Sequence, residues 1–265
     1  MLIIGERLNG ASKKVAGAIK NGGDGYLCSL AAAQTGAGAD LLDICSGLRD
    51  GDLEALGHMI SVIQKRLPGV RFSVDTPDPK VMLACLPLCD TPGMINSVTP
   101  DDGSAGIILP AAKNTGWAIT ALLLSKDGGD PVEGRLSAFK RLMDTAEKCG
   151  IDPERIYFDP MVRSIAVSPD SFAVFSETVR RVRAEYPEAR IICGVSNISY
   201  GMPCRRALNR AFITAAAALG VNAAIADPLS PDIMSGIYAA EALTGGEDGV
   251  MRYIEACREG VIGES

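Results

Sequence analysis

Short apolar runs recur along the chain at the spacing of a strand followed by a helix. Eight of them cover residues 2–4, 41–44, 70–74, 94–95, 118–124, 156–158, 191–193 and 223–226. Both alternating positions of each run are apolar, which is typical of strands buried on two faces in a parallel sheet. The pattern therefore predicts eight parallel strands joined by crossover segments.

The segments between the runs carry signals for the ends of helices. Asp130 followed by Pro131 predicts an N-cap and a first helical turn, and Gly150 predicts the end of that helix. Ser168 and Pro169 predict the start of a second helix, which continues with apolar residues on one face. These two helices fill the crossovers after the fifth and sixth runs.

Further helices are predicted at residues 205–219 and 233–243, after the last two runs. Residues 105–113 carry only a weak helical pattern because Pro110 interrupts it. No G-x-G-x-x-G segment follows an early run, which disfavours an open dinucleotide-binding sheet. Eight alternating units in 265 residues favour a closed (β/α)8 TIM barrel, with residues 1–265 forming a single domain.

Composition narrows the classes of function. With 47% hydrophobic and 22% charged residues, the chain can bury a large core. A formal net charge of -6 and a content of 6 Phe, 6 Tyr and 1 Trp offer little to phosphate backbones or bases, so no nucleic acid partner is expected. No apolar stretch reaches the roughly 20 residues of a membrane span. No basic segment precedes the first apolar run, and we expect a cytoplasmic location without a membrane partner.

The eight cysteines do not indicate a metal or disulfide framework. None of them forms a C-x-x-C pair, and most lie inside apolar runs. Unpaired cysteine is among the most buried residue types. We therefore expect buried free thiols in a reducing compartment.

Polar side chains follow almost every predicted strand. They are Glu6, Asn9, Asp43, Asp75, Asn96, Asp159, Ser196, Asn197 and Asp227. In a barrel all of them would lie at the C-terminal rim, where such folds place their active sites. Capping of the next helix is the alternative for each one, and it stays open for Asp43 and Asp227 in particular. The lone histidine, His58, lies in a helical stretch and is not expected to be catalytic.

A rim of carboxylates and amides without an evident nucleophile suits a flat heterocycle that is rich in hydrogen-bond donors. Hard cations also bind oxygen ligands, so spacing alone leaves a divalent metal open. We expect none, because no cluster of Cys or His ligands is present.

Five segments resemble a known family. They are GERLN at 5–9, SVDT at 73–76, INS at 95–97, FDP at 158–160 and GVSNISYGMPCRRALN at 194–209. The chain resembles the methyltetrahydrofolate:corrinoid protein methyltransferases, and the same pattern occurs in the folate domain of cobalamin-dependent methionine synthase. The resemblance runs nearly the full length and implies a pterin-binding barrel of the dihydropteroate-synthase-like type.

The resemblance also implies a folate site. Its cofactor-binding residues would be Glu6, Asn9, Asp75, Asn96, Asp159, Gly194, Ser196, Asn197 and Arg205. Asp75, Asn96 and Asp159 would hold the pterin edge. Asn197 would reach the methyl-bearing nitrogen and would act in catalysis together with Asp159 and Asp75.

The implied reaction moves a methyl group between 5-methyltetrahydrofolate and the cobalt of a corrinoid, in a direction that the sequence leaves undetermined. The corrinoid would belong to a partner protein, and the enzyme would be a homodimer. Three alternatives remain: a dihydropteroate synthase, a folate-binding subunit without turnover and a metal-dependent barrel lyase. The synthase would carry a Gly-x-Ser-Arg motif on the seventh strand, which reads GVSN here. Short loops after the strands predict an open mouth for the partner.

Overall fold

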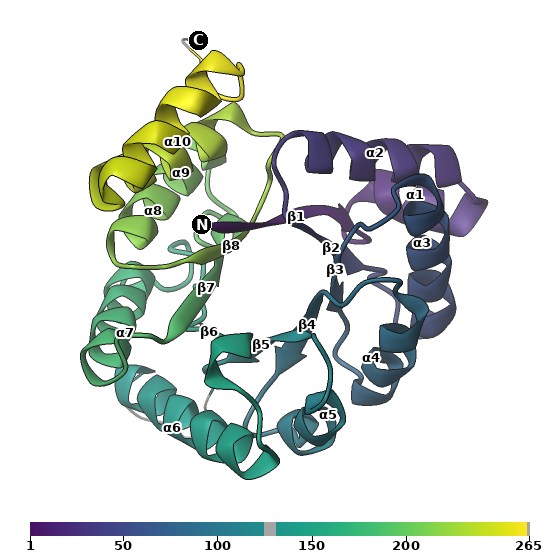
Figure 1. Ribbon diagram of the computed structural model, residues 1–265, viewed down its shortest axis with the longest axis horizontal. Helices are drawn as coiled ribbons and strands as arrows, with labels where there is room; N and C mark the ends of the chain where they lie inside the picture. Colours follow the sequence, from purple (N-terminus) through teal and green to yellow (C-terminus); the bar gives the residue numbers. More distant parts are fainter. Residues whose placement is uncertain (125–130, 264–265) are drawn as a thin grey trace.

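Eight parallel strands close into a barrel in the order β1 to β8, inside a ring of helices (Figure 1). The computed structural model describes residues 1–124 and 131–263. The strands are β1 (Leu2–Asn9), β2 (Leu41–Cys45), β3 (Phe72–Asp75), β4 (Met94–Val98), β5 (Ala118–Leu122), β6 (Ile156–Asp159), β7 (Arg190–Gly194) and β8 (Ala223–Ala226). The barrel closes where β1 pairs in parallel with β8. The predicted (β/α)8 fold is confirmed.

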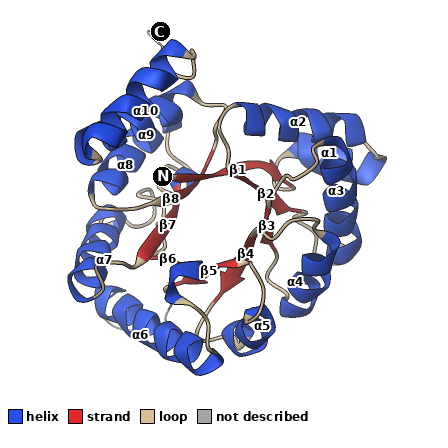
Figure 2. Ribbon diagram, viewed as in Figure 1, coloured by secondary structure: helices blue, strands red, loops and turns tan. Residues whose placement is uncertain are grey.

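Figure 2 shows the helical ring outside the strands. Its helices are α1 (Lys13–Asn21), α2 (Asp24–Gly36), α3 (Asp52–Arg66), α4 (Pro79–Cys85), α5 (Ser104–Ala112), α6 (Pro131–Cys149), α7 (Ser171–Glu185), α8 (Arg205–Ala218), α9 (Pro231–Thr244) and α10 (Gly246–Arg258). Three short 3-10 turns add η1 (Leu86–Leu88), η2 (Pro153–Arg155) and η3 (Val195–Asn197). The last helix, α10, lies against α9 on the outside of the ring (Figure 1).

Successive residues of each strand alternate between two apolar layers. The outer layer packs against the helices and includes Leu42, Ile44 and Phe158. A smaller inner cluster fills the barrel with Ile4, Leu41, Met94, Tyr157, Ile192 and Ala223. Because side chains alternate along a strand, the next inward positions toward the C-terminal ends are polar. This alternation aims the carboxylates and amides into the barrel mouth.

Helix starts depart from the sequence prediction in one of two cases. The predicted helix after β5 forms as α6, but its proposed cap, Asp130, lies outside the described residues. Ser168 and Pro169 do not begin α7, which starts at Ser171. The N–H of Ser171 donates to the Ser168 carbonyl at 2.9 Å in a preceding turn, and the Ser171 hydroxyl accepts from the Arg163 N–H at 2.9 Å. The helix therefore begins after this turn, at Ser171.

The weak helix pattern around Pro110 forms α5 in full. Its C-terminal carbonyls are held by Arg155 of η2, which donates to Ala112 at 2.7 Å and to Lys113 at 3.0 Å. The same guanidinium donates to the carbonyl of Trp117 before β5. Tertiary hydrogen bonds therefore compensate for the proline inside the helix.

Several strand boundaries and the burial of the thiols differ from the prediction. Strand β1 continues to Asn9 and strand β4 to Val98, so Glu6 and Asn96 lie inside their strands and do not follow them. Strand β3 begins at Phe72 because Val70 closes a turn with its N–H on the Leu67 carbonyl. Strand β5 ends at Leu122. All eight cysteines are free, as expected, but only Cys85 and Cys193 are buried. Within the described ranges, no helix combines the length and the apolar character that crossing a membrane requires.

Candidate active site

Asp43 is the most buried carboxylate of the barrel mouth. One of its oxygens accepts hydrogen bonds from the Ser73 hydroxyl at 2.7 Å and from the Asn96 amide at 3.1 Å. Burial and the neighbouring charge of Asp75 raise the pKa of Asp43 to about 7. Asp43 is therefore an internal partner of Asn96 and not a helix cap, which settles the alternative left open by the sequence.

Asp75 lies beside Asp43 at the end of β3. The thiol of Cys45 donates to the Asp75 carboxylate, which lowers its pKa, but burial outweighs that bond and raises the pKa above its usual value. The charge of Asp52 raises it further. The charge of Asp75 in turn raises the pKa of Asp43, so the protonation of one carboxylate depends on the charge of the other.

Asp159 ends β6 on the same rim. It is buried and accepts a hydrogen bond from the Met161 N–H at 2.7 Å. Burial raises the pKa of Asp159 to about 6, against the effects of that bond and of the Arg135 charge. Arg135 donates to the Met161 carbonyl at 2.7 Å, so it clamps the loop after β6. Met161 itself has a φ of 61°, a left-handed conformation that its two hydrogen bonds hold in place.

Asn197 closes η3 directly after β7, and its side chain is exposed. A methyl group added at Gly194 would lie 2.8 Å from the Asn197 amide nitrogen. Gly194 has φ -85° and ψ 109°, which any residue can adopt, so the glycine is required for space and not for backbone freedom. The Asn197 amide therefore folds back over the strand end.

The loop of Asn197 is held from two sides. Ser196 donates its hydroxyl to Glu6 of β1, whose pKa is raised by burial. Arg205, at the start of α8, donates to the Ser196 carbonyl at 2.8 Å and to the Ser199 hydroxyl at 3.0 Å. Glu6, Ser196 and Arg205 thus meet around this loop, whereas nothing in the sequence grouped Glu6 with the other two.

Asn9 and Asp227 have local partners at the rim. The side-chain oxygen Oδ1 of Asn9 accepts from the Ala11 N–H at 2.9 Å, which stabilises the turn after β1. Asp227 accepts from the Leu229 N–H at 3.0 Å and pairs with Arg7 at 2.8 Å. Asp227 does not cap α9, whose N-cap residue is Ser230; it stabilises the turn after β8 and holds Arg7.

His58 lies on α3 outside the mouth and contacts Asp24 of α2 at 2.8 Å, with both side chains exposed. Residues 1–124 and 131–263 contain no group of three or more Cys, His, Asp or Glu side chains arranged to hold a metal ion. The sequence reading missed Asp52 and Arg135, since both lie on helices, where a charged residue normally faces solvent.

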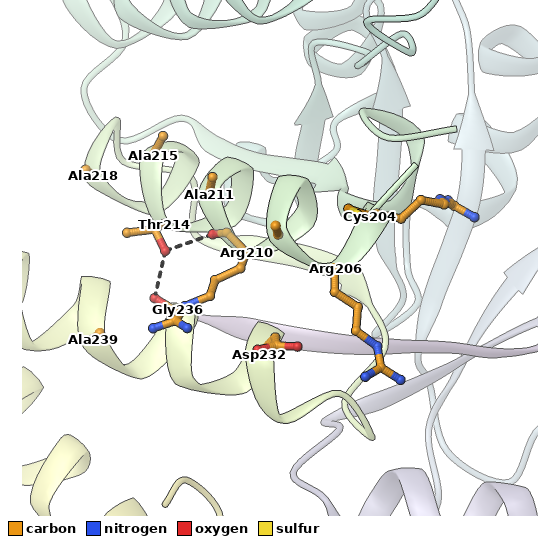
Figure 3. Close-up of a pocket in the computed structure, with 12 residues that line it drawn as sticks. Cys204, Arg206, Arg210, Ala211, Thr214, Ala215, Ala218, Asp232, Gly236 and Ala239 are labelled. Carbon is orange, nitrogen blue, oxygen red and sulfur yellow. Dashed lines mark hydrogen bonds between the residues drawn. The ribbon is translucent and has the colours of Figure 1, made fainter. Parts of the chain in front are cut away.

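A separate cavity of about 1110 Å³ lies between α8 and α9. Figure 3 shows Arg206 and Arg210 extending from α8 toward α9, which carries Asp232. Thr214 donates to the Arg210 carbonyl at 2.9 Å along this groove. Five alanines and three arginines are among the residues that line it, so it differs from the carboxylate-rich mouth.

Comparison with known proteins agrees with the resemblance inferred from the five segments. A methylcorrinoid:tetrahydrofolate methyltransferase of Eubacterium limosum is 34% identical over 267 residues, which cover 99% of this chain and 98% of the relative. A methionine synthase of Mycobacterium leprae (strain TN) is 28% identical over 243 residues, which cover 85% of this chain. The matched region is 20% of that synthase, so the chain corresponds to about a fifth of it.

Solved structures share the fold at low sequence identity. The Yersinia pestis DHPS bound to a pterine-sulfa conjugate has a TM-score of 0.70 and 18% identity, covering 93% of this chain and 94% of that one. A dihydropteroate synthase from Coxiella burnetii in complex with pteroic acid has a TM-score of 0.69 and 17% identity, covering 91% and 92%. The sequence pattern of the family described as "Pterin binding enzyme" matches residues 5–227, and the chain therefore belongs to the pterin-binding enzymes.

Proposed function

We propose that this protein is a methyltransferase that moves a methyl group between a tetrahydrofolate and the cobalt of a corrinoid protein. The observation that carries the proposal is the layer of hydrogen-bond acceptors in the barrel mouth, with the Asn197 amide folded over its edge at Gly194. The name of the relative from Eubacterium limosum supports the same reaction.

The acceptor layer fits the edge of a pterin. A pterin presents an amino group and a ring N–H, which Asp75 and Asp159 would accept. The side-chain N–H of Asn96 donates to Asp43, and this leaves the side-chain oxygen of Asn96 as a further acceptor. Asp43 therefore sets the direction in which Asn96 faces the ligand.

Asn197 is assigned to the methyl-bearing nitrogen. When the methyl group leaves, its bonding electrons stay on that nitrogen, so a positioned amide N–H stabilises the growing electron density. The reduced corrinoid supplies the metal that accepts the methyl group, and the same contacts serve the reverse direction. Gly194 leaves the space in which the Asn197 amide lies, and Arg205 fixes the carbonyl of Ser196 next to it.

The nitrogen also has to gain a proton once the methyl group has gone. Asp159 has a pKa of about 6 and Asp43 one of about 7, so both hold protons for part of the time at neutral pH. We assign the network that delivers this proton to Asp159, Asp75 and ordered water beside Asn197. The chain contributes orientation and electrostatics to this chemistry.

The proposal also covers the metal content, the partner protein and the oligomeric state. The protein holds no metal of its own, uses a corrinoid-binding partner and forms a homodimer through a face other than the mouth. Residues 1–265 act as a single domain, and a cytoplasmic location remains a prediction. Sedimentation of the purified protein measures the oligomeric state.

Calorimetry with metal-free protein tests the folate site. We expect 5-methyltetrahydrofolate to bind, and Asp75→Ala or Asp159→Ala to weaken binding by on the order of 1.5–3 kcal/mol per lost charge-assisted bond. His58→Ala, on the outside of the ring, serves as the control and leaves the affinity unchanged. Unaltered affinity in both aspartate variants would refute the assigned pocket.

A further inference from the structure

The loops after β2 and β3 are tied together by one carboxylate that lies outside the barrel. Asp52, the first residue of α3, accepts a hydrogen bond from the Ser46 hydroxyl on one oxygen. Its second oxygen accepts from the Thr76 hydroxyl at 2.6 Å. Asp52 is 9% exposed, so the two bonds are formed away from solvent. Ser46 and Thr76 directly follow Cys45 and Asp75 in the chain.

These two loops frame Asp75. On the side of β2, the Cys45 thiol donates to the Asp75 carboxylate. On the side of β4, the Thr76 N–H donates to the backbone carbonyl of Asn96 at 3.3 Å. Movement of the Ser46 or Thr76 loop would therefore displace Asp75 from its partners. Asp52 is the only side chain among the described residues that bonds to both loops through one functional group.

Helix capping does not account for Asp52. The N-cap position of α3 belongs to Gly51, which has a φ of 78° and makes no side-chain bond. Both Asp52 oxygens are instead occupied by the hydroxyl groups of Ser46 and Thr76. Within the described ranges Asp52 forms no ion pair, so its negative charge is balanced by hydroxyl dipoles and by the positive end of α3.

We propose that Asp52 is a positioning residue, which fixes the Asp75 carboxylate at the barrel mouth and thereby sets the affinity and pH dependence of folate binding. The folate part rests on the proposed function, whereas the positioning of Asp75 does not. The groups that face Asp75 are Asp43 and Cys45 on β2 and Asp52 on α3. Glu6 on β1 acts on Asp43 by its charge.

The sign of the pH effect follows from these groups. Burial is the largest cause of the raised pKa of Asp75, and the negative charge of Asp52 adds to it. Removing that charge makes the ionised form of Asp75 easier to reach. Because ionised Asp75 is the form that accepts from the pterin, folate binding would then persist to lower pH.

The variant Asp52→Asn tests the proposal against Glu54→Gln. Both remove one negative charge from the first turn of α3, but Glu54 is exposed and bonds to neither loop. Carbon-13 detected titration of the Asp75 carboxyl in the free protein is the first readout. We expect Asp52→Asn to lower its midpoint by about one pH unit, and Glu54→Gln to leave it within roughly a quarter of a unit.

Calorimetry with 5-methyltetrahydrofolate between pH 5 and pH 8 is the second readout. At pH 7.5, Asp52→Asn should weaken folate binding about fivefold, because one of the two accepting oxygens of Asp52 is replaced by an NH2 group, which only donates. The pH below which folate affinity falls should be lower in Asp52→Asn than in the wild type, by the same amount as the Asp75 midpoint. A purely structural role would lower the melting temperature without moving either midpoint.

A second pair of variants keeps the test decisive if Asp52→Asn folds poorly. Thr76→Val keeps the shape but removes the hydroxyl, which donates to Asp52 and accepts from the Asp78 N–H at 3.4 Å, whereas Thr76→Ser restores it. We expect Thr76→Val to weaken folate binding about fivefold and Thr76→Ser to recover most of that loss.

The outcomes separate the two claims. If the Asp75 midpoint and the affinity of Asp52→Asn match those of Glu54→Gln, Asp52 has no positioning role. Equal affinities of Thr76→Val and Thr76→Ser would lead to the same conclusion. If the wild-type protein binds no folate while Thr76→Val, which removes no charge, still moves the Asp75 midpoint and Thr76→Ser does not, the proposed function fails and the positioning role stands.

Discussion

Asn197 is assigned to the atom whose charge changes most during methyl transfer. We expect Asn197→Ala to lower the rate of transfer about 10²- to 10³-fold and to change folate affinity little, because its bond strengthens only as the nitrogen gains electron density. Single-turnover kinetics beside calorimetry separates the two effects. Equal losses in affinity and in rate would instead assign Asn197 to ground-state binding.

Gly194 provides an independent check on the same contact. An alanine there is compatible with the backbone, but its methyl group would lie 2.8 Å from the Asn197 amide nitrogen and displace it. Gly194→Ala should therefore lower the rate about a hundredfold and leave the melting temperature nearly unchanged. In an Asn197→Ala background the same change should add little, since coupled sites are not additive. Additive losses would contradict the contact.

The raised pKa of Asp43 should make the free energy of unfolding depend on pH. Its pKa of about 7 in the folded protein lies above the ordinary value of 3.8, so the folded state binds more protons than the unfolded state between these values. The free energy of unfolding should therefore fall as pH rises from about 4 to about 7. Asp43→Asn keeps an acceptor for Ser73 and Asn96, and it should raise the free energy of unfolding at pH 8 by roughly 2 kcal/mol.

Urea denaturation at pH 4.5 and pH 8 measures this effect. The two proteins should be close in stability at the lower pH and separate at the higher pH. A variant that is less stable than the wild type at pH 8 would contradict the assigned protonation of Asp43.

Individual residues differ in how far the sequence predicted their place. The rim positions of Asp75 and Asp159 follow from strand endings, which are visible in the apolar pattern. Asn96 was also expected after a strand, but it lies inside β4 and reaches the mouth because its side chain points inward. The partners of Asp43 and Asp52 depend on which residues of neighbouring strands and loops lie opposite one another. That information is tertiary, so a single sequence left Asp43 undecided and gave no signal for Asp52.

At the level of elements, α5 depends on a distant arginine. Arg155 donates to the carbonyls of Ala112, Lys113 and Trp117, and a lysine cannot reach three acceptors in that planar arrangement. Arg155→Lys should lower the free energy of unfolding by about 1–3 kcal/mol and leave folate affinity unchanged. Arg180→Lys, whose ion pair with Glu177 is exposed, is the control and should stay within about 0.5 kcal/mol. Equal stabilities of the two variants would rule out this role.

The sequence predicted elements where one signal dominates. The strands and α6 follow from apolar runs and from the Pro131 and Gly150 signals. The predicted start of α7 was wrong because Ser168 and Ser171 belong to a hydrogen-bonded turn before the helix, and the bond from Arg163 to Ser171 is not visible in the sequence. The last helix, α10, was not predicted. It packs against α9 and does not belong to the repeating pattern of a strand followed by a helix.

At the scale of the whole molecule, the alternation along eight strands explains both the barrel and its mouth. Outward positions are apolar throughout, and inward positions change from apolar at one end to acidic at the other. Burying several carboxylates in one mouth costs stability, and that cost is consistent with a binding site. The same acidic mouth should favour a neutral, donor-rich ring system over anionic ligands.

Anaerobic mixing with 5-methyltetrahydrofolate and a reduced corrinoid protein tests the central claim most directly. The optical spectrum of the corrinoid should change to that of its methylated form at a rate proportional to enzyme concentration, and Asn197→Ala should slow the change at least about a hundredfold. The reverse mixture, of methylated corrinoid protein and tetrahydrofolate, should show the opposite change. Tight folate binding without any enzyme-dependent spectral change in either direction, with corrinoid protein or with free cobalamin, would contradict the assignment as a methyltransferase.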